Sequence, residues 1–108
     1  MAYQHQSLSS GRWFALSLIE QLGNIGSEIS RAKNAGNDSD RSWSAIVRAF
    51  ELLDLTISDS RWQTRLKELL RTREVLGDAI LGGQEYHTTL EDMDRYFYYF
   101  ALAARAKH

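Results

Sequence analysis

The stretch QLGNIGSEISRA, residues 21–32, decides the fold because its residues separate onto the faces of one helix. Its apolar residues recur every three or four positions, which predicts a helix with one buried face. These residues are Leu22, Ile25, Ile29 and Ala32. Gly23 and Gly26 lie along an edge beside that face, and a glycine inside a helix costs roughly 1 kcal/mol relative to alanine. We therefore expect another helix to pack closely against this edge.

The same spacing continues through the chain, which contains no proline, and it predicts four helices. We expect them at about residues 9–35, 40–57 and 61–81, with the fourth starting at a capping box formed by Thr88 and Glu91. Residues 1–8 are expected to be a flexible N-terminal tail. Short connections favour antiparallel neighbours, so the 108 residues should form one all-α domain, an up-down-up-down four-helix bundle.

The second expected helix is apolar on two faces, which is typical of a central helix or of one that also meets a second subunit. The face expected in the core carries Trp43, Ile46, Phe50, Leu53 and Ile57. The other face carries Leu52 and Leu55, which we treat as interface candidates together with the edge formed by Gly23 and Gly26. The third expected helix should bury Trp62, Leu66, Leu69, Leu70, Leu76 and Ile80.

Composition excludes several classes of protein. The chain contains no cysteine, which removes disulfides, thiol catalysis and thiolate zinc sites. Its formal net charge is −1, so no global attraction to nucleic acid or anionic lipid is expected. No apolar run approaches the roughly 20 residues of a spanning helix, and no signal peptide is recognisable. We therefore expect a cytoplasmic protein without a membrane partner.

Polar residues at the margins of the apolar faces are candidates for a buried polar network or a ligand pocket. They are Gln21, Asn24, Glu28, Arg31, Glu51, Asp54, Arg71, Arg73 and Glu74. Arg73 falls inside the apolar stripe of its helix, where a guanidinium suits a buried ion pair with Glu28, Glu51, Asp54 or Glu74. Two alternatives are a phosphate pocket, in which Arg73 joins Arg71 and either Arg48 or Arg31, and an arginine of which only the stem is buried.

No catalytic constellation stands out in the sequence. The Glu-x-x-His pairs of di-metal helical bundles do not occur, and His87 is the only histidine away from the termini. We expect no catalytic residue, no metal and no cofactor, and His87 should be a solvated loop residue. A magnesium site formed by Glu28, Glu51 and Asp54 is the remaining metal alternative.

The run YFYYFALAAR, residues 96–105, carries more tyrosines than one buried helix face can accommodate. An exposed tyrosine is typical of an interface, where its apolar ring is covered and its hydroxyl finds a partner. Tyr96, Tyr98, Tyr99 and Arg105 are therefore further interface candidates. Base stacking on these tyrosines is the functional alternative.

The stretches QLGNIGSEISRA, RAFELLDLTISD, RLKELLRTRE and YFYYFALAAR resemble a prokaryotic family of small helical proteins whose function is uncharacterised. More loosely, the helical plan is similar to HEPN-type bundles, many of which are toxin ribonucleases or partners of nucleotidyltransferases, and to the four-helix-bundle proteins encoded in ribosomal-RNA intervening sequences. The HEPN arginine would correspond to Arg73. The histidine that follows this arginine closely in HEPN ribonucleases does not occur here.

Taken together, these patterns indicate a non-enzymatic helical-bundle protein. It would act as a homo-oligomer, a dimer in the simplest case, or as the accessory subunit of a larger protein partner. The alternative is a HEPN-like bundle that binds nucleic acid or nucleotides through Arg71, Arg73 and the tyrosine run without the Arg/His ribonuclease motif.

Overall fold

The computed structural model describes residues 11–106 of the chain, so the expected tail at residues 1–8 lies outside the described residues. These 96 positions are 83% helical and contain no strand, and the predicted all-α, four-helix fold is confirmed. The elements are η2 (Trp13–Ala15), α1 (Leu18–Asn34), α2 (Ser39–Ser58), η3 (Ser60–Arg65), α3 (Leu66–Ile80) and α4 (Leu90–Ala106).

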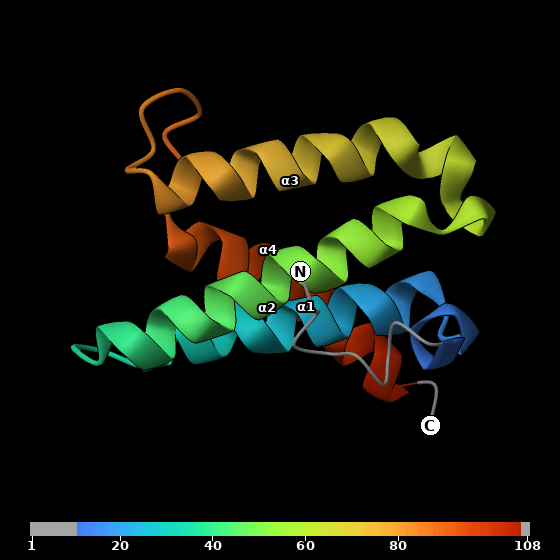
Figure 1. Cartoon of the computed structure of the whole chain (residues 1–108), viewed down its shortest axis with the longest axis horizontal. Coiled ribbons are helices and arrows are strands. Elements are labelled where there is room, and N and C mark those ends of the chain that lie inside the picture. Colours follow the sequence, from blue (N-terminus) through green and yellow to red (C-terminus); the bar gives the residue numbers. More distant parts are fainter. Residues whose placement is uncertain (1–10, 107–108) are drawn as a thin grey trace.

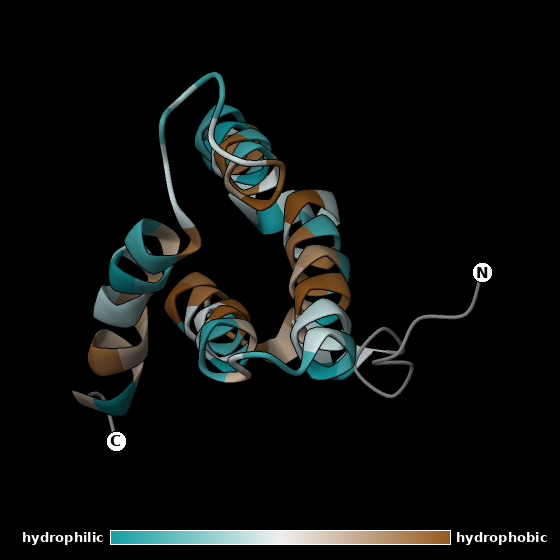
Figure 2. Cartoon of the chain, turned by 90° about the vertical axis from the view of Figure 1, so that its left-hand side faces the viewer, coloured by the Kyte–Doolittle hydropathy of each residue, from teal (hydrophilic) through white to brown (hydrophobic). Residues whose placement is uncertain are grey.

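Helix α1 lies at the centre of the contacts, between α2 and α4, as Figures 1 and 2 show. Successive helices run back and forth, and α3 closes the fourth side of the bundle above α2 and α4. Helix α3 makes far fewer contacts with its neighbours than α1 makes with α2 or α4. The bundle is therefore a tight three-helix layer with a more loosely attached fourth helix.

The first helix begins at Leu18 and not near residue 9, because Ser17 caps it. Ser17 has extended backbone geometry, its Oγ accepts from the backbone N–H of Glu20 at 3.2 Å, and its own N–H donates to Glu20 Oε1 at 2.9 Å. This reciprocal pair satisfies two backbone donors that a helix start leaves open. The preceding residues form the short helix η2, which buries Trp13.

The capping box of α4 lies one residue later than predicted. Thr89 Oγ1 accepts from the N–H of Asp92 at 3.1 Å, and the N–H of Thr89 donates to Asp92 Oδ2 at 3.0 Å. The expected pair of Thr88 and Glu91 is therefore wrong. His87 has a positive φ of 56°, and this turn places Thr89, not Thr88, at the helix start.

Leu52 and Leu55 are buried inside the chain, which contradicts their prediction as interface residues. They belong to the same core cluster as Ile25, Ile29 and Phe97, and α2 is apolar on two sides because it packs against both α1 and α3. Trp43, near the start of α2, is 61% exposed and was wrongly expected in the core.

Helix α3 buries only Leu69 and Leu76. Leu66 and Leu70 were expected to point inward, but they are 36% and 47% exposed. Because α3 touches the remaining helices along a narrow stripe, its apolar periodicity overstates how much of its surface is covered.

The glycine edge of α1 packs against α4 within the same chain. A Cβ added at Gly26 would lie 2.8 Å from the Cβ of Phe97, and one added at Gly23 would lie 3.3 Å from the Cα of Ala101. The prediction of close helix packing at these glycines is confirmed. Their prediction as a surface for a second subunit is wrong, because α4 already covers both.

Replacing Gly26 with alanine tests this close approach. We expect Gly26→Ala to destabilise the fold by about 1–3 kcal/mol, the usual cost of overpacking, although alanine favours a helix. Gly77→Ala on α3 is the matched control, since no atom lies within 4 Å of the added Cβ. This control should gain about 0.5–1 kcal/mol. Urea unfolding measures both, and a Gly26→Ala protein as stable as the Gly77→Ala protein would contradict the packing argument.

Candidate functional site

Arg73 lies at the surface between α3 and α2, and not in the core. Its Nε donates to Asp54 Oδ1 at 2.6 Å and its Nη2 to Asp54 Oδ2 at 3.3 Å, while its guanidinium lies 5.2 Å from the centre of the Phe50 ring. The two side chains are 44% and 45% exposed. Asp54 was among the predicted partners, but the predicted burial of Arg73 is wrong because α3 covers so little of α2.

The exposure of this pair changes the expected effect of removing it. A solvated ion pair contributes about 0.2–1 kcal/mol, since water and salt screen it. We therefore expect Arg73→Met to lower the free energy of unfolding by less than about 1 kcal/mol in urea titrations. Asp54→Asn is the matched control and should have an effect of the same size. A loss of several kcal/mol in Arg73→Met would show that the arginine is buried in solution.

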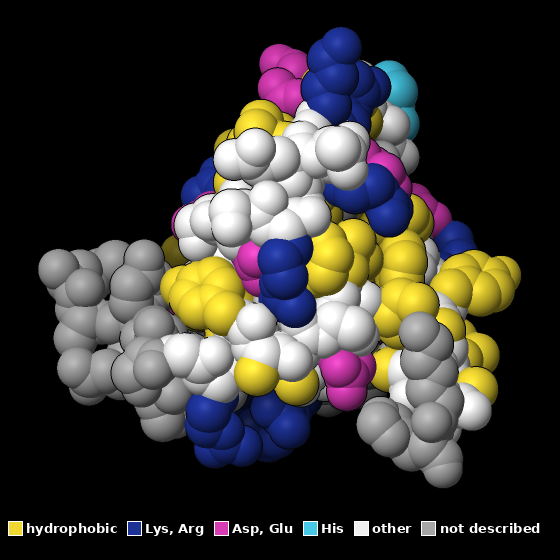
Figure 3. Space-filling view, turned by 90° about the vertical axis from the view of Figure 1, so that its right-hand side faces the viewer, with side chains coloured by type: hydrophobic (Ala, Val, Ile, Leu, Met, Phe, Trp, Pro, Cys, Tyr) yellow, Lys and Arg dark blue, Asp and Glu magenta, His cyan; other side chains and the backbone are white. Residues whose placement is uncertain are grey.

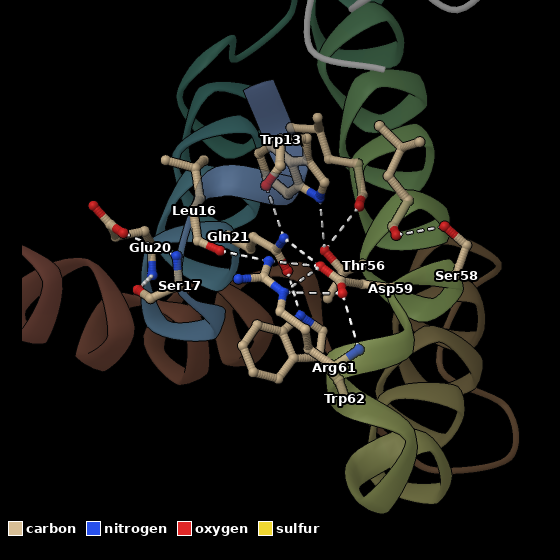
Figure 4. Close-up of polar contacts among 12 residues, drawn as sticks. Trp13, Leu16, Ser17, Glu20, Gln21, Thr56, Ser58, Asp59, Arg61 and Trp62 are labelled. Atoms are coloured by element: carbon tan, nitrogen blue, oxygen red, sulfur yellow. Dashed lines mark hydrogen bonds and ion pairs between the residues drawn. The ribbon is translucent and has the colours of Figure 1, made fainter. Parts of the chain in front are cut away.

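The polar network of the core forms around Gln21, which is fully buried (Figure 4). Gln21 Nε2 donates to the carbonyl oxygen of Trp13 at 2.9 Å and to Asp59 Oδ2 at 3.2 Å, and its Oε1 accepts from Trp62 Nε1 at 2.9 Å. Trp13 Nε1 in turn donates to Thr56 Oγ1 at 3.1 Å. The predicted polar role of Gln21 is thus structural, because its amide joins η2, α2 and η3.

Asp59 is the buried carboxylate of this network. Arg61 binds it through Nη2 at 2.7 Å and through Nε at 3.1 and 3.2 Å, and the backbone N–H of Arg61 donates to Oδ1 at 3.1 Å. Arg61 also donates to the carbonyl oxygen of Leu16 at 2.7 Å. The side-chain hydrogen bonds from Arg61, with smaller contributions from its backbone N–H and from Gln21, hold the pKa of Asp59 below its usual value.

The lowered pKa makes a part of the stability depend on pH. Because the folded pKa of Asp59 lies below the unfolded value near 4, ionised Asp59 stabilises the fold above that pH, and this stabilisation is lost as the pH falls through the folded pKa. We expect Asp59→Asn to unfold at lower urea concentration than the wild type at pH 7. This difference should shrink steadily below about pH 4.

A matched acid on the surface controls for the general effect of acid. Glu85 lies in the exposed loop before α4, and Glu85→Gln should follow the wild-type pH profile. The proposed role of Asp59 would be refuted by a constant difference between Asp59→Asn and wild type from pH 7 down to acid unfolding.

Of the residues in this network, only Gln21 was predicted from the sequence as a polar candidate. Trp62 was expected only as an apolar core residue of the third helix, and Trp13 and Asp59 were not among the polar candidates. The indole N–H groups are the missed signal, since a buried tryptophan needs an acceptor.

A second polar cluster lies between α1 and α2 and involves Glu28, Arg31 and Arg48. Glu28 is buried, and its two carboxylate oxygens each accept from Arg31 Nη1 at 3.2 Å, while Oε1 also accepts from Arg48 Nε at 3.3 Å. Arg48 Nη1 donates to Ser44 Oγ at 2.7 Å. Glu28, predicted as a partner of Arg73, therefore binds two other arginines.

This cluster borders a surface groove of about 630 Å³, which we call the arginine groove. Its lining residues are Ser27, Ser30, Arg31, Asn34, Arg41, Ser44 and Arg48. Of the arginines predicted for a phosphate pocket, the structure brings Arg31 and Arg48 together here, whereas Arg71 and Arg73 lie on α3. Arg41 also lines the groove and was missed, because only the packing of α1 against α2 makes the face shared by Arg41, Ser44 and Arg48 part of a groove.

The remaining polar candidates are dispersed. Asn24 is exposed and donates to the carbonyl oxygen of Glu20 one turn earlier. Glu51 is buried on α2. On α3, Glu74 accepts from the hydroxyl of Tyr86 at 3.2 Å, and the Arg71 guanidinium lies 4.7 Å from the centre of the Tyr86 ring.

The proposed magnesium ligands are not assembled into a site. Within residues 11–106, no three His, Asp or Glu side chains form a group that could hold a metal ion. The carboxylates of Glu28 and Asp54 instead bind arginines on different sides of the molecule.

The outer face of α4 is apolar and open. Tyr98, Tyr99 and Leu102 are 54%, 72% and 42% exposed, and the hydrophobic side chains on the right of Figure 3 gather over this helix. Tyr96 is less exposed because its ring packs edge-on against those of Phe97 and Phe100. Arg105 is exposed near the end of the same helix.

A second groove of about 410 Å³ separates α3 from α4. It is lined by Glu68, Arg71, Thr72, Val75, Thr88, Asp92, Met93 and Tyr96. The groove reaches Met93, which is in the core cluster, so the contact between these two helices is incomplete.

No protein family matches the sequence, and neither a curated protein nor a solved structure is significantly similar to the chain. The resemblance to HEPN-type bundles therefore stays a prediction. Across residues 11–106, none of the helices combines the length and the apolar character needed to cross a membrane.

Proposed function

We propose that the protein acts by association and not by catalysis, as a homodimer formed through the outer face of α4. The observation that carries the proposal is the exposure of Tyr98, Tyr99 and Leu102 together on one helix. Isolated exposed apolar side chains are normal, but a contiguous set with aromatic residues is typical of an interface.

The spacing along α4 supports a helix as the partner. Glu91, Arg95, Tyr98, Leu102 and Arg105 follow one another at intervals of four and three residues, which places them in one stripe. The stripe lies opposite Met93 and Phe97, which α4 buries. A second amphipathic helix laid along this stripe would cover its two apolar members in the middle.

The charges at the two ends of α4 favour an antiparallel copy of the same helix. The first turn carries Glu91 and Asp92, which outnumber the one arginine, Arg95, that binds them, and the last turn carries Arg105. In an antiparallel pair related by a two-fold axis, the acidic end of each helix lies beside the basic end of its partner, twice per dimer. A second copy of the chain is therefore a complementary partner for this face.

The other surfaces predicted for association do not support it. Leu52, Leu55, Gly23 and Gly26 are covered within the chain. The alternative of a HEPN-like bundle that binds nucleic acid or nucleotides stays a prediction; Arg73, one of its expected residues, binds Asp54.

Sedimentation equilibrium of the full chain at micromolar concentration tests the dimer. We expect a mass twice the chain mass of 12.4 kDa. The double variant Tyr98→Glu/Leu102→Glu should sediment as a monomer, since two charges per chain would then be buried in the interface. Leu70→Glu is the matched control, because Leu70 is similarly exposed on α3, and it should remain dimeric.

Circular dichroism of each variant would establish that the helices are retained. A monomeric wild type would refute the homodimer, and a dimer that survives the double substitution would place the interface elsewhere. Capture of a different protein by a monomeric wild type would instead favour the role of an accessory subunit.

A further inference from the structure

The arginine groove between α1 and α2 has the composition of an anion site. Its seven lining residues include three arginines, three serines and one asparagine, and none is apolar. Ser42 Oγ donates to the carbonyl oxygen of Ala32 at 3.1 Å, which fixes the end of α1 beside the start of α2. As a result, the last turns of α1 and the first turns of α2 lie side by side, and both helices contribute hydrogen-bond donors to the groove.

The groove is positive in a chain whose formal net charge is −1. It is lined by Arg31, Arg41 and Arg48, of which Arg31 and Arg48 bind the carboxylate of Glu28. Asp38 and Asp40 lie near the start of α2, and Asp38 already caps that helix by accepting from the N–H of Arg41. The side chain of Arg41 is exposed, and in the part of the chain that the structure describes no ion pair holds it.

Glu28 acts as a positioning residue. Its buried carboxylate binds the guanidinium groups of both Arg31 and Arg48, and Ser44 holds the second of these from its own helix. The Arg48 side chain is only 26% exposed, so its orientation is set before a ligand arrives. Such preorganisation lowers the entropic cost of binding.

The donors match phosphate better than other anions or bases. Guanidinium groups bind phosphate oxygens in two places at once, and serine and asparagine side chains are frequent further donors to phosphate. The groove has no aromatic lining, so it offers no ring for stacking a nucleic-acid base.

We propose that the arginine groove binds the phosphate groups of a small di- or triphosphate. Arg41 and Arg48 are seven residues apart on α2, which corresponds to about 10.5 Å along the helix axis. A chain of two or three phosphates reaches along this distance better than a single phosphate does. The site is independent of the outer face of α4.

Isothermal titration calorimetry of the full chain with pyrophosphate and with ADP, at low salt, tests the proposal. We expect saturable binding with one site per chain that weakens steeply as salt is raised, because the contacts are ionic. The variant Arg31→Gln/Arg41→Gln should bind at least 10-fold more weakly, roughly 1.4 kcal/mol. Both arginines are exposed, and Arg48 still binds the buried Glu28 in this variant, so circular dichroism should show that the helices are retained.

Arg71→Gln is the matched control, because Arg71 is an exposed arginine on α3, outside the groove. It should bind both probes like the wild type. Equal affinity for pyrophosphate and ADP would identify a free polyphosphate as the ligand class, whereas tighter binding of ADP would identify a nucleotide; either result supports the site. The absence of saturable binding of both probes, or an equal loss in Arg71→Gln and the double variant, would overturn it.

Discussion

The close approach of α1 and α4 at Gly26 and Gly23 is the constraint on which the rest of the structure depends. Two backbones can come this near only where no side chain separates them, and the Cβ of Phe97 and the backbone of Ala101 occupy that space. The approach seats the Phe97 ring in the core cluster with Ile25 and Ile29. It also decides which face of α4 is buried, and thus which face carries tyrosines into solvent.

The start of α1, just before the two glycines, is fixed by polar contacts. The Gln21 side chain accepts a hydrogen bond from the indole N–H of Trp62 and donates one to the backbone carbonyl of Trp13. Its amide therefore holds η2 and η3 in place beside the start of α1. A buried amide with all its partners present specifies one arrangement more strongly than an apolar residue of the same size, because any other arrangement leaves polar atoms without hydrogen bonds.

The spacing of apolar residues predicted that the chain forms four helices. It also predicted which residues α1 buries, because the residues at helical spacing in α1 are all covered by neighbouring helices. The same spacing failed at Leu66, Leu70, Trp43 and Arg73, since spacing identifies a face but not how much of that face a neighbour covers. It could not assign a carboxylate to each arginine either. Asp54 and Glu28 bind Arg73 and Arg48 through tertiary packing, across 19 and 20 positions of sequence, whereas Asp59 binds Arg61 only two positions away. Arg41 illustrates the same limit, because only the register of α1 against α2 makes it part of a groove.

The sparse attachment of α3 has a consequence for the dynamics of the protein. Helix α3 buries only Leu69 and Leu76, and an open groove lies between it and α4. Its detachment would therefore break fewer contacts than the detachment of α1. Its amide hydrogens should exchange through a subglobal opening of low free energy, while those of α1 exchange only when the whole domain unfolds. Such an opening would expose Met93 of the core, which already lines the groove between α3 and α4, while the contacts among α1, α2 and α4 stay in place.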